Sequence, residues 1–111
     1  MQINVAVVGG TGAEGSGLAL RFATGGARVF LGSRDLEKAQ DAARRISAQA
    51  STTEVTGHTN KDAVAAAGIV VLTVPLSAQV ETLKSIRDSI ARGAILVDAT
   101  VQFGSRVRLI A

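Results

Sequence analysis

Short apolar runs alternate along this chain with longer amphipathic stretches, which is the pattern of consecutive strand and helix units. Five short apolar runs predict buried strands, at residues 3–8, 28–31, 54–56, 69–74 and 94–97. Four stretches have helical periodicity, at residues 12–24, 35–50, 61–67 and 77–91. This order predicts an α/β fold, a Rossmann-like doubly wound parallel sheet of about five strands and four helices in three layers.

The ends of these elements follow from residues that stop or cap them. Gly25 and Gly26 end the first helix, Asn60 is a plausible N-cap for the third, and Pro75 ends the fourth strand. Two helices have apolar stripes that we expect to face the core, Leu36, Ala39, Ala43 and Ile46 in the second and Val80, Leu83, Ile86 and Ile90 in the fourth.

Composition narrows the class of protein. The 111 residues fit one domain, predicted to cover residues 1–111, and a chain that is 47% hydrophobic with only 3% aromatic residues must build its core from Val, Ile, Leu and Ala. The chain has no cysteine, so we predict no disulfide and no metal site, and we expect a cytoplasmic protein with no membrane association. The net charge of +3 is spread without aromatic stacking residues, so no nucleic-acid partner is expected.

The most informative motif follows the first strand directly. Gly10-Thr11-Gly12-Ala13-Glu14-Gly15 has the Gly-x-Gly-x-x-Gly spacing and opens the first helix. In that setting backbone N–H groups and the helix N-terminus can receive a pyrophosphate. Glycines that merely permit a tight turn are the alternative interpretation, which the flanking strand and helix make less favourable.

The end of the second strand selects the nucleotide. A site for NAD needs a carboxylate there, because the ribose 2′-hydroxyl donates to it. This strand instead ends in Gly32, Ser33 and Arg34, and Lys38 follows one helical turn later. A hydroxyl and two cations suit a 2′-phosphate, so the sequence predicts NADPH as the cofactor, although a merely solvated basic helix face is the alternative.

Three further polar residues need an interpretation. His58 is expected in an exposed loop between the third strand and the third helix, away from the predicted crevice. Glu14 should point to solvent or cap the first helix, because a carboxylate aimed at a phosphate would be unfavourable. Asp98 could contact a ribose or substrate, or stabilise the turn that follows the last strand.

Four stretches resemble the NADPH-dependent reductases of coenzyme F420, a 5-deazaflavin. They are residues 9–21, the Gly32-Ser33-Arg34 run with Lys38, residues 56–63, and Leu72-Thr73-Val74-Pro75. The resemblance implies that Thr11, Ala13 and Glu14 contact the phosphates, and that Ser33, Arg34 and Lys38 hold the 2′-phosphate. It also implies that Thr73, Val74 and Pro75 line the nicotinamide ribose.

Members of that family continue into a second, mostly helical portion, whereas this sequence stops at Ala111. The expected reaction is hydride transfer between NADPH and a deazaflavin or similar acceptor, a small-molecule redox co-substrate. No catalytic side chain is predicted, since the two cofactors carry this chemistry and the protein aligns their rings. The alternatives are an NADP-dependent reductase of an imine or 2-hydroxy acid, and a non-catalytic NADPH-binding or sensing module that could be a homodimer.

Overall fold

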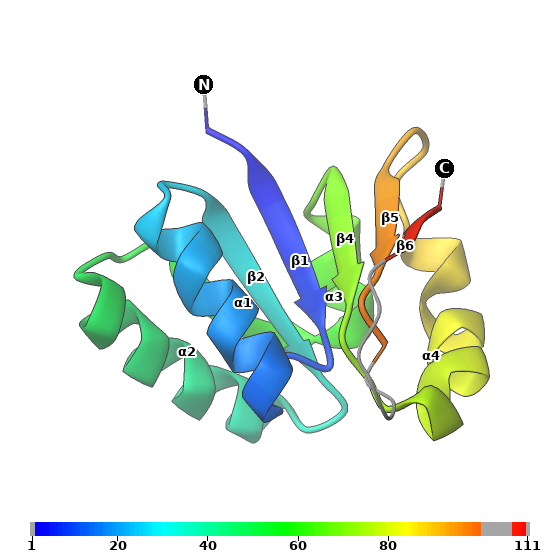
Figure 1. The fold of residues 1–111 in the computed structure, drawn as a ribbon, viewed down its shortest axis with the longest axis horizontal. Helices are drawn as coiled ribbons and strands as arrows, with labels where there is room; N and C mark the ends of the chain where they lie inside the picture. Colours follow the sequence, from blue (N-terminus) through cyan, green and yellow to red (C-terminus); the bar gives the residue numbers. More distant parts are fainter. Residues whose placement is uncertain (1, 101–107, 111) are drawn as a thin grey trace.

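The computed structural model describes residues 2–100 and 108–110. Figure 1 shows strands and helices alternating along most of this length. In chain order the elements are β1 (Asn4–Val8), α1 (Ala13–Thr24), β2 (Arg28–Ser33), α2 (Leu36–Ala50), β3 (Val55–Thr59), α3 (Asn60–Ala65), β4 (Ile69–Leu72), η1 (Leu76–Ala78), α4 (Gln79–Ile86), η2 (Arg87–Ser89), β5 (Ile95–Asp98) and β6 (Arg108–Ile110).

The strands form one sheet in the order β3-β2-β1-β4-β5-β6, in which the first five are parallel. Val8 at the end of β1 pairs with Gly32 of β2 on one side and with Leu72 of β4 on the other. The strand order reverses between β1 and β4, and ligands of open α/β sheets bind at such a switch point. The predicted Rossmann-like α/β fold is therefore confirmed.

Helices cover both faces of the sheet, with α1 and α2 on one face and α3 and α4 on the other (Figure 1). Alternate residues of β1 supply the two cores: Val5 and Val7 pack under α1 and α2, and Ala6 and Val8 pack under α3 and α4. The part of a strand that is buried on both faces is apolar at every position, which is why Val5 to Val8 appear in the sequence as one continuous apolar run.

Several expectations about the elements are wrong. The fourth helix is not one helix over residues 77–91 but a short α-helix between the 3₁₀ turns η1 and η2. Leu36 and Val80, expected in the core, are 44% and 60% exposed. The sheet also has a sixth strand, β6, which runs antiparallel to β5 in a segment that the sequence pattern did not predict as a strand.

The third strand is longer than predicted and reaches Thr59. His58 is therefore in a strand and not in an exposed loop: its Nε2 lies 2.7 Å from Thr56 Oγ1 and its ring centroid lies 5.5 Å from that of Phe30. The N-cap of α3 is Thr59, whose hydroxyl accepts from the backbone N–H of Asp62, so the predicted cap at Asn60 is wrong by one residue.

Candidate functional site

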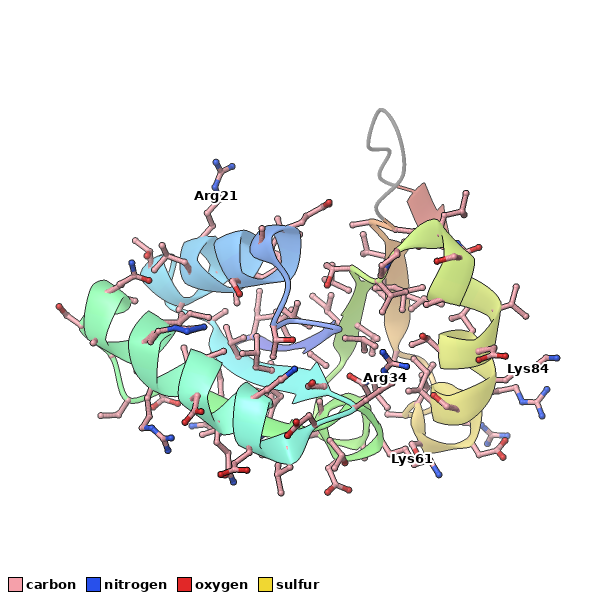
Figure 2. All side chains as sticks on the ribbon, turned by 90° about the horizontal axis from the view of Figure 1, so that it is seen from below. Arg21, Arg34, Lys61 and Lys84 are labelled. Atoms are coloured by element: carbon pink, nitrogen blue, oxygen red, sulfur yellow. The ribbon has the colours of Figure 1, made fainter. Side chains whose placement is uncertain are left out.

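A cleft of about 600 Å³ lies at the carboxyl ends of the parallel strands. Figure 2 views the molecule from this edge, where the start of α1 and the end of β2 lie opposite η1 and α4. The lining residues are Gly9, Thr11, Gly12, Ala13, Glu14, Ser33, Arg34, Asp35, Lys38, Asn60, Thr73, Val74, Pro75, Ala78 and Thr82.

The cleft brings together every predicted site residue except Gly10. Gly10 lies beneath it, where its N–H donates to the carbonyl of Gly32 at 2.9 Å and its carbonyl accepts from Ser16 Oγ at 3.0 Å. A β-carbon at Gly10 would come within 2.5 Å of Leu31 Cδ1. Gly10 therefore lets the turn pass close over β2, and whether it also contacts a ligand stays a prediction.

The start of α1 presents backbone donors to the cleft. Its N-cap is Gly12, which has no side chain to cap the helix, and the first hydrogen bond of the helix runs from Ser16 N–H to Gly12 C=O at 2.9 Å. The N–H groups of Ala13 and Glu14 precede that bond, and both residues line the cleft. An uncapped helix N-terminus with a positive dipole end is an anion-binding arrangement.

Thr73 holds the turn from below. Its side chain is buried, and its hydroxyl lies 2.8 Å from the carbonyl oxygen of Val8 and 3.2 Å from that of Gly9. Because the hydroxyl proton is donated to these backbone carbonyls, Thr73 has no side-chain donor left for a ligand and can only accept a hydrogen bond or contact it through its methyl group. Its clearest contribution is to fix the end of β1 and the start of the glycine turn.

Two cations of the cleft follow β2, Arg34 directly after the strand and Lys38 in the first turn of α2. Within residues 2–100, neither Arg34 nor Lys38 forms an ion pair, whereas Arg28 and Arg44 pair with carboxylates. Ser33 is buried and its Oγ accepts from the N–H of Asp35 at 3.1 Å, which leaves its hydroxyl proton free to donate.

The side chain of Arg34 is directed across the cleft. In Figure 2 it extends from the end of β2 toward α4, whereas Arg21 and Lys84 point away from the protein. Arg34 is exposed, so its guanidinium can adjust to a bound anion. Arg34 and Lys38, which form no ion pair with the described residues, and the hydroxyl of Ser33 together form a site suited to a phosphate group.

Asp35 is a neighbouring carboxylate that sequence reasoning did not assign to the cleft. Its Oδ1 accepts from the N–H groups of Glu37 at 3.0 Å and Lys38 at 3.3 Å, so it caps α2. In the sequence Asp35 stands just before a stretch whose apolar residues have helical spacing, and an aspartate in that place is typical of a helix N-cap. The negative charge is thus placed at the positive end of a helix, where it is stabilised.

Four further lining residues were not predicted, Gly9, Asn60, Ala78 and Thr82. Asn60 was interpreted as a helix cap, and its contact with Gly9 joins residues far apart in the sequence, which local pattern cannot reveal. Glu14 lines the cleft and forms no hydrogen bond within the described part of the chain, so it does not cap α1.

The two sides of the cleft differ in chemistry. The ionisable lining residues, Glu14, Arg34, Asp35 and Lys38, belong to the start of α1 or to the segment that leads from β2 into the first turn of α2. The opposite wall consists of uncharged residues, Thr73, Val74, Pro75, Ala78 and Thr82. Asp98 does not line the cleft; it is buried, and its carboxylate accepts from Gln79 Nε2 at 2.6 Å and from the Thr100 N–H at 2.9 Å. One side therefore suits phosphates, and the other suits a flat uncharged ring.

Comparison with known proteins gives a family match over most of the chain. Residues 4–102 match the family described as NADP oxidoreductase, coenzyme F420-dependent. The F420-dependent NADP reductase of Methanothermobacter thermautotrophicus is 51% identical over 117 residues, covering 99% of this chain and 50% of that protein. Those of Methanothermobacter marburgensis and Methanocaldococcus jannaschii are 46% and 31% identical, covering 97% and 95% of this chain and 51% and 48% of their own lengths. The chain spans about half the length of these relatives.

Solved structures show the same architecture. The (S)-3-hydroxybutyryl-CoA dehydrogenase of Ralstonia eutropha superposes with a TM-score of 0.74 at 19% identity, over 88% of this chain and 41% of that one. A diketoreductase superposes with a TM-score of 0.72 at 18% identity, over 92% of this chain and 43% of that one. At this identity the similarity shows a common fold.

Proposed function

We propose that this chain, which belongs to the coenzyme F420-dependent NADP oxidoreductase family, binds NADP(H) in the cleft and takes part in hydride transfer between NADPH and a 5-deazaflavin. The observation that carries the proposal is a pair of cations, Arg34 and Lys38, which form no ion pair with any described residue and lie in the same cleft as the uncapped start of α1. Together they offer two anion sites on one side of a single cleft, as a nucleotide with a pyrophosphate and a 2′-phosphate requires.

The glycine turn fits the pyrophosphate. At Gly12 a β-carbon would meet only the carbonyl oxygen of Gly9, at 3.9 Å, so the backbone there is open toward the cleft. The N–H groups at the start of α1 can then approach phosphate oxygens without an intervening side chain. Thr73 and the N–H to C=O bond from Gly12 to Gly9 hold this turn in shape.

The end of β2 fits the 2′-phosphate and disfavours NADH. An NAD site has a carboxylate at the end of the second strand, and this chain has Ser33 and Arg34 there. The nearby carboxylate of Asp35 accepts through its Oδ1 from the first N–H groups of α2, so it serves as the helix cap. The segment after β2 therefore offers a 2′-phosphate a hydroxyl and two cations, where an NAD site would offer the 2′-hydroxyl a strand-end carboxylate.

The uncharged wall suits the nicotinamide end. Bound nicotinamide and deazaflavin supply the hydride chemistry themselves, which needs two rings held face to face. Val74, Pro75 and Ala78 provide apolar surface that excludes water from one side of such a ring. The wall carries no ionisable group, so its residues position the ring and do not move protons.

The deazaflavin as acceptor is supported by the names of the relatives, which are F420-dependent NADP reductases. Its contacts are not assigned to residues of this chain. A cytoplasmic location and a homodimer remain predictions. Within the described residues no helix could cross a bilayer, the longest having 15 residues.

The proposal is tested by calorimetric titration with NADPH and NADH in parallel. We expect selective NADPH binding, and we expect Arg34→Gln with Lys38→Gln to reduce NADPH affinity to the level of NADH. Arg21→Gln is the matched control, because Arg21 points away from α1 into solvent (Figure 2). Equal binding of both nucleotides, or binding of neither, would contradict the proposal. Oxidised F420 added to the NADPH complex then tests hydride transfer through the nicotinamide absorbance.

A further inference from the structure

Asn60 is a buried polar residue on the floor of the cleft, with 8% of its surface exposed. It is the first residue of α3, but Thr59 caps that helix, so the Asn60 carboxamide is not needed for capping. Its side chain instead lies between the ends of β1 and β2. Its Oδ1 is 3.3 Å from Gly9 N, and a β-carbon at Gly32 would lie 2.6 Å from the same oxygen.

The contact with Gly9 fixes the backbone at the point where β1 turns toward α1. Gly9 has a φ of +75°, a left-handed conformation that other residues rarely adopt. Its N–H donates to the Asn60 side chain, so the atom facing it must be the carboxamide oxygen. Asn60 thus satisfies a backbone donor that the sheet leaves unpaired, and it positions the start of the glycine turn.

The other end of the carboxamide is available. Within the described part of the chain, Asn60 Nδ2 donates no hydrogen bond, and no buried side-chain nitrogen or oxygen lacks a partner. The Nδ2 group must therefore reach accessible surface, and Asn60 lines the cleft. A donor held in a rigid, mostly buried side chain is well placed to bind a ligand acceptor.

We propose that Asn60 is a further nucleotide-binding residue, whose Oδ1 positions the glycine turn and whose Nδ2 donates to an oxygen of the adenosine ribose. This inference rests on the proposed function. Gly9 leads into the turn that suits the pyrophosphate, and Gly32 leads into Ser33 and Arg34, which suit the 2′-phosphate. In NADP(H) the group that joins those two phosphates is the adenosine ribose, so a donor between Gly9 and Gly32 faces it.

Two substitutions separate the two ends of the carboxamide. Asn60→Asp keeps an acceptor for the Gly9 N–H but loses the Nδ2 donor, and Asn60→Ala loses both. We expect amide hydrogen exchange at Gly9 to be slow in the native chain and in Asn60→Asp, and fast in Asn60→Ala. Unchanged exchange at Gly9 in Asn60→Ala would overturn the positioning role.

Binding of adenosine 2′,5′-bisphosphate and NADPH tests the donor. We expect Asn60→Asp to weaken both about ten-fold, by the same factor, and the loss to persist at high salt. The control is Asn4→Asp, the same substitution at the far end of β1, where the side chain donates to the carbonyl oxygen of Ala66. Full affinity in Asn60→Asp, a loss confined to NADPH, or a loss that high salt removes would overturn the donor role. Failure of the native chain to bind NADPH would instead overturn the proposed function.

Discussion

A β-carbon on Gly15 would lie 2.7 Å from Thr73 Oγ1, so the first turn of α1 and the end of β4 meet at a point that admits no side chain on the helix. The same β-carbon would lie 2.7 Å from the α-carbon of Gly10. Thr73 cannot easily move away, because its hydroxyl is bonded to the carbonyl of Val8. The third glycine of the motif is thus required by packing, and it allows α1 to start close to the sheet.

We therefore expect opposite effects of alanine at two glycines of α1. Gly15→Ala should destabilise the fold by about 1–3 kcal/mol, because the added methyl meets backbone and a fixed hydroxyl. At Gly17 a β-carbon would meet nothing within 4 Å, and Gly17→Ala should stabilise the fold by up to about 1 kcal/mol through helix propensity. Denaturant unfolding of the two variants measures both effects. Equal stability of Gly15→Ala and the native chain would show that this contact is not tight.

The sequence predicted the parts of the site that depend on local chemistry. A glycine turn after a buried strand and a hydroxyl with two cations at the end of the next strand require only short-range spacing, and the parallel topology then places them at one edge. The two side-chain hydrogen bonds to the backbone of Gly9 could not be predicted in this way. Asn60 and Thr73 approach it from 51 and 64 residues away, which only the folded sheet determines.

The errors in the helices also have a physical cause. Val80 has the right spacing for the apolar stripe of a single long helix. Val80 and Ile86 both lie in α4, six residues apart, so at about 100° per residue they are separated by about 120° around the helix axis. Val80 therefore faces solvent while Ile86 is buried. The continuous stripe is expected from one helix over residues 77–91, whereas α4 ends at Ile86 and only part of that stripe lies on the face that packs against the sheet.

Asp35 allows a test of the cap on α2. Asp35→Ala should lower the free energy of unfolding by about 1 kcal/mol, because the N–H groups of Glu37 and Lys38 lose their acceptor. Asp35→Asn keeps an acceptor oxygen and should change stability by only a few tenths of a kcal/mol. Chemical denaturation distinguishes the two, and equal loss in both variants would show that the charge and not the cap matters.

Gln79 joins the start of α4 to the end of β5. Its Nε2 donates to Asp98 at 2.6 Å and to Thr100 Oγ1 at 3.2 Å, and both partners are buried. Gln79→Ala should destabilise the fold by about 1–3 kcal/mol, since a buried carboxylate loses a donor. Gln40→Ala on the exposed face of α2 is the control and should leave stability almost unchanged. Thermal unfolding of both variants measures the two effects. A melting temperature of Gln79→Ala equal to that of Gln40→Ala would show that the hydrogen bonds of Gln79 contribute little to stability.

Glu14 places a negative charge in the side of the cleft that we assign to phosphates. It lines the cleft beside the uncapped start of α1, and no described residue pairs with its carboxylate. Removing the charge in Glu14→Gln should therefore raise NADPH affinity roughly three-fold at low salt, because the repulsion of a partly solvated charge is worth somewhat less than about 1 kcal/mol.

The control for this prediction is Glu37→Gln, which removes the same charge from the first turn of α2 at an exposed position outside the cleft. It should leave NADPH affinity within a factor of two, because its side chain is exposed and does not line the cleft, so water and salt screen its charge. Calorimetric titration at two salt concentrations provides the measurement, and the gain in Glu14→Gln should shrink as salt rises. An unchanged or lower affinity in Glu14→Gln would mean that the carboxylate does not face the phosphates, and the pyrophosphate would then have to be placed away from the first turn of α1.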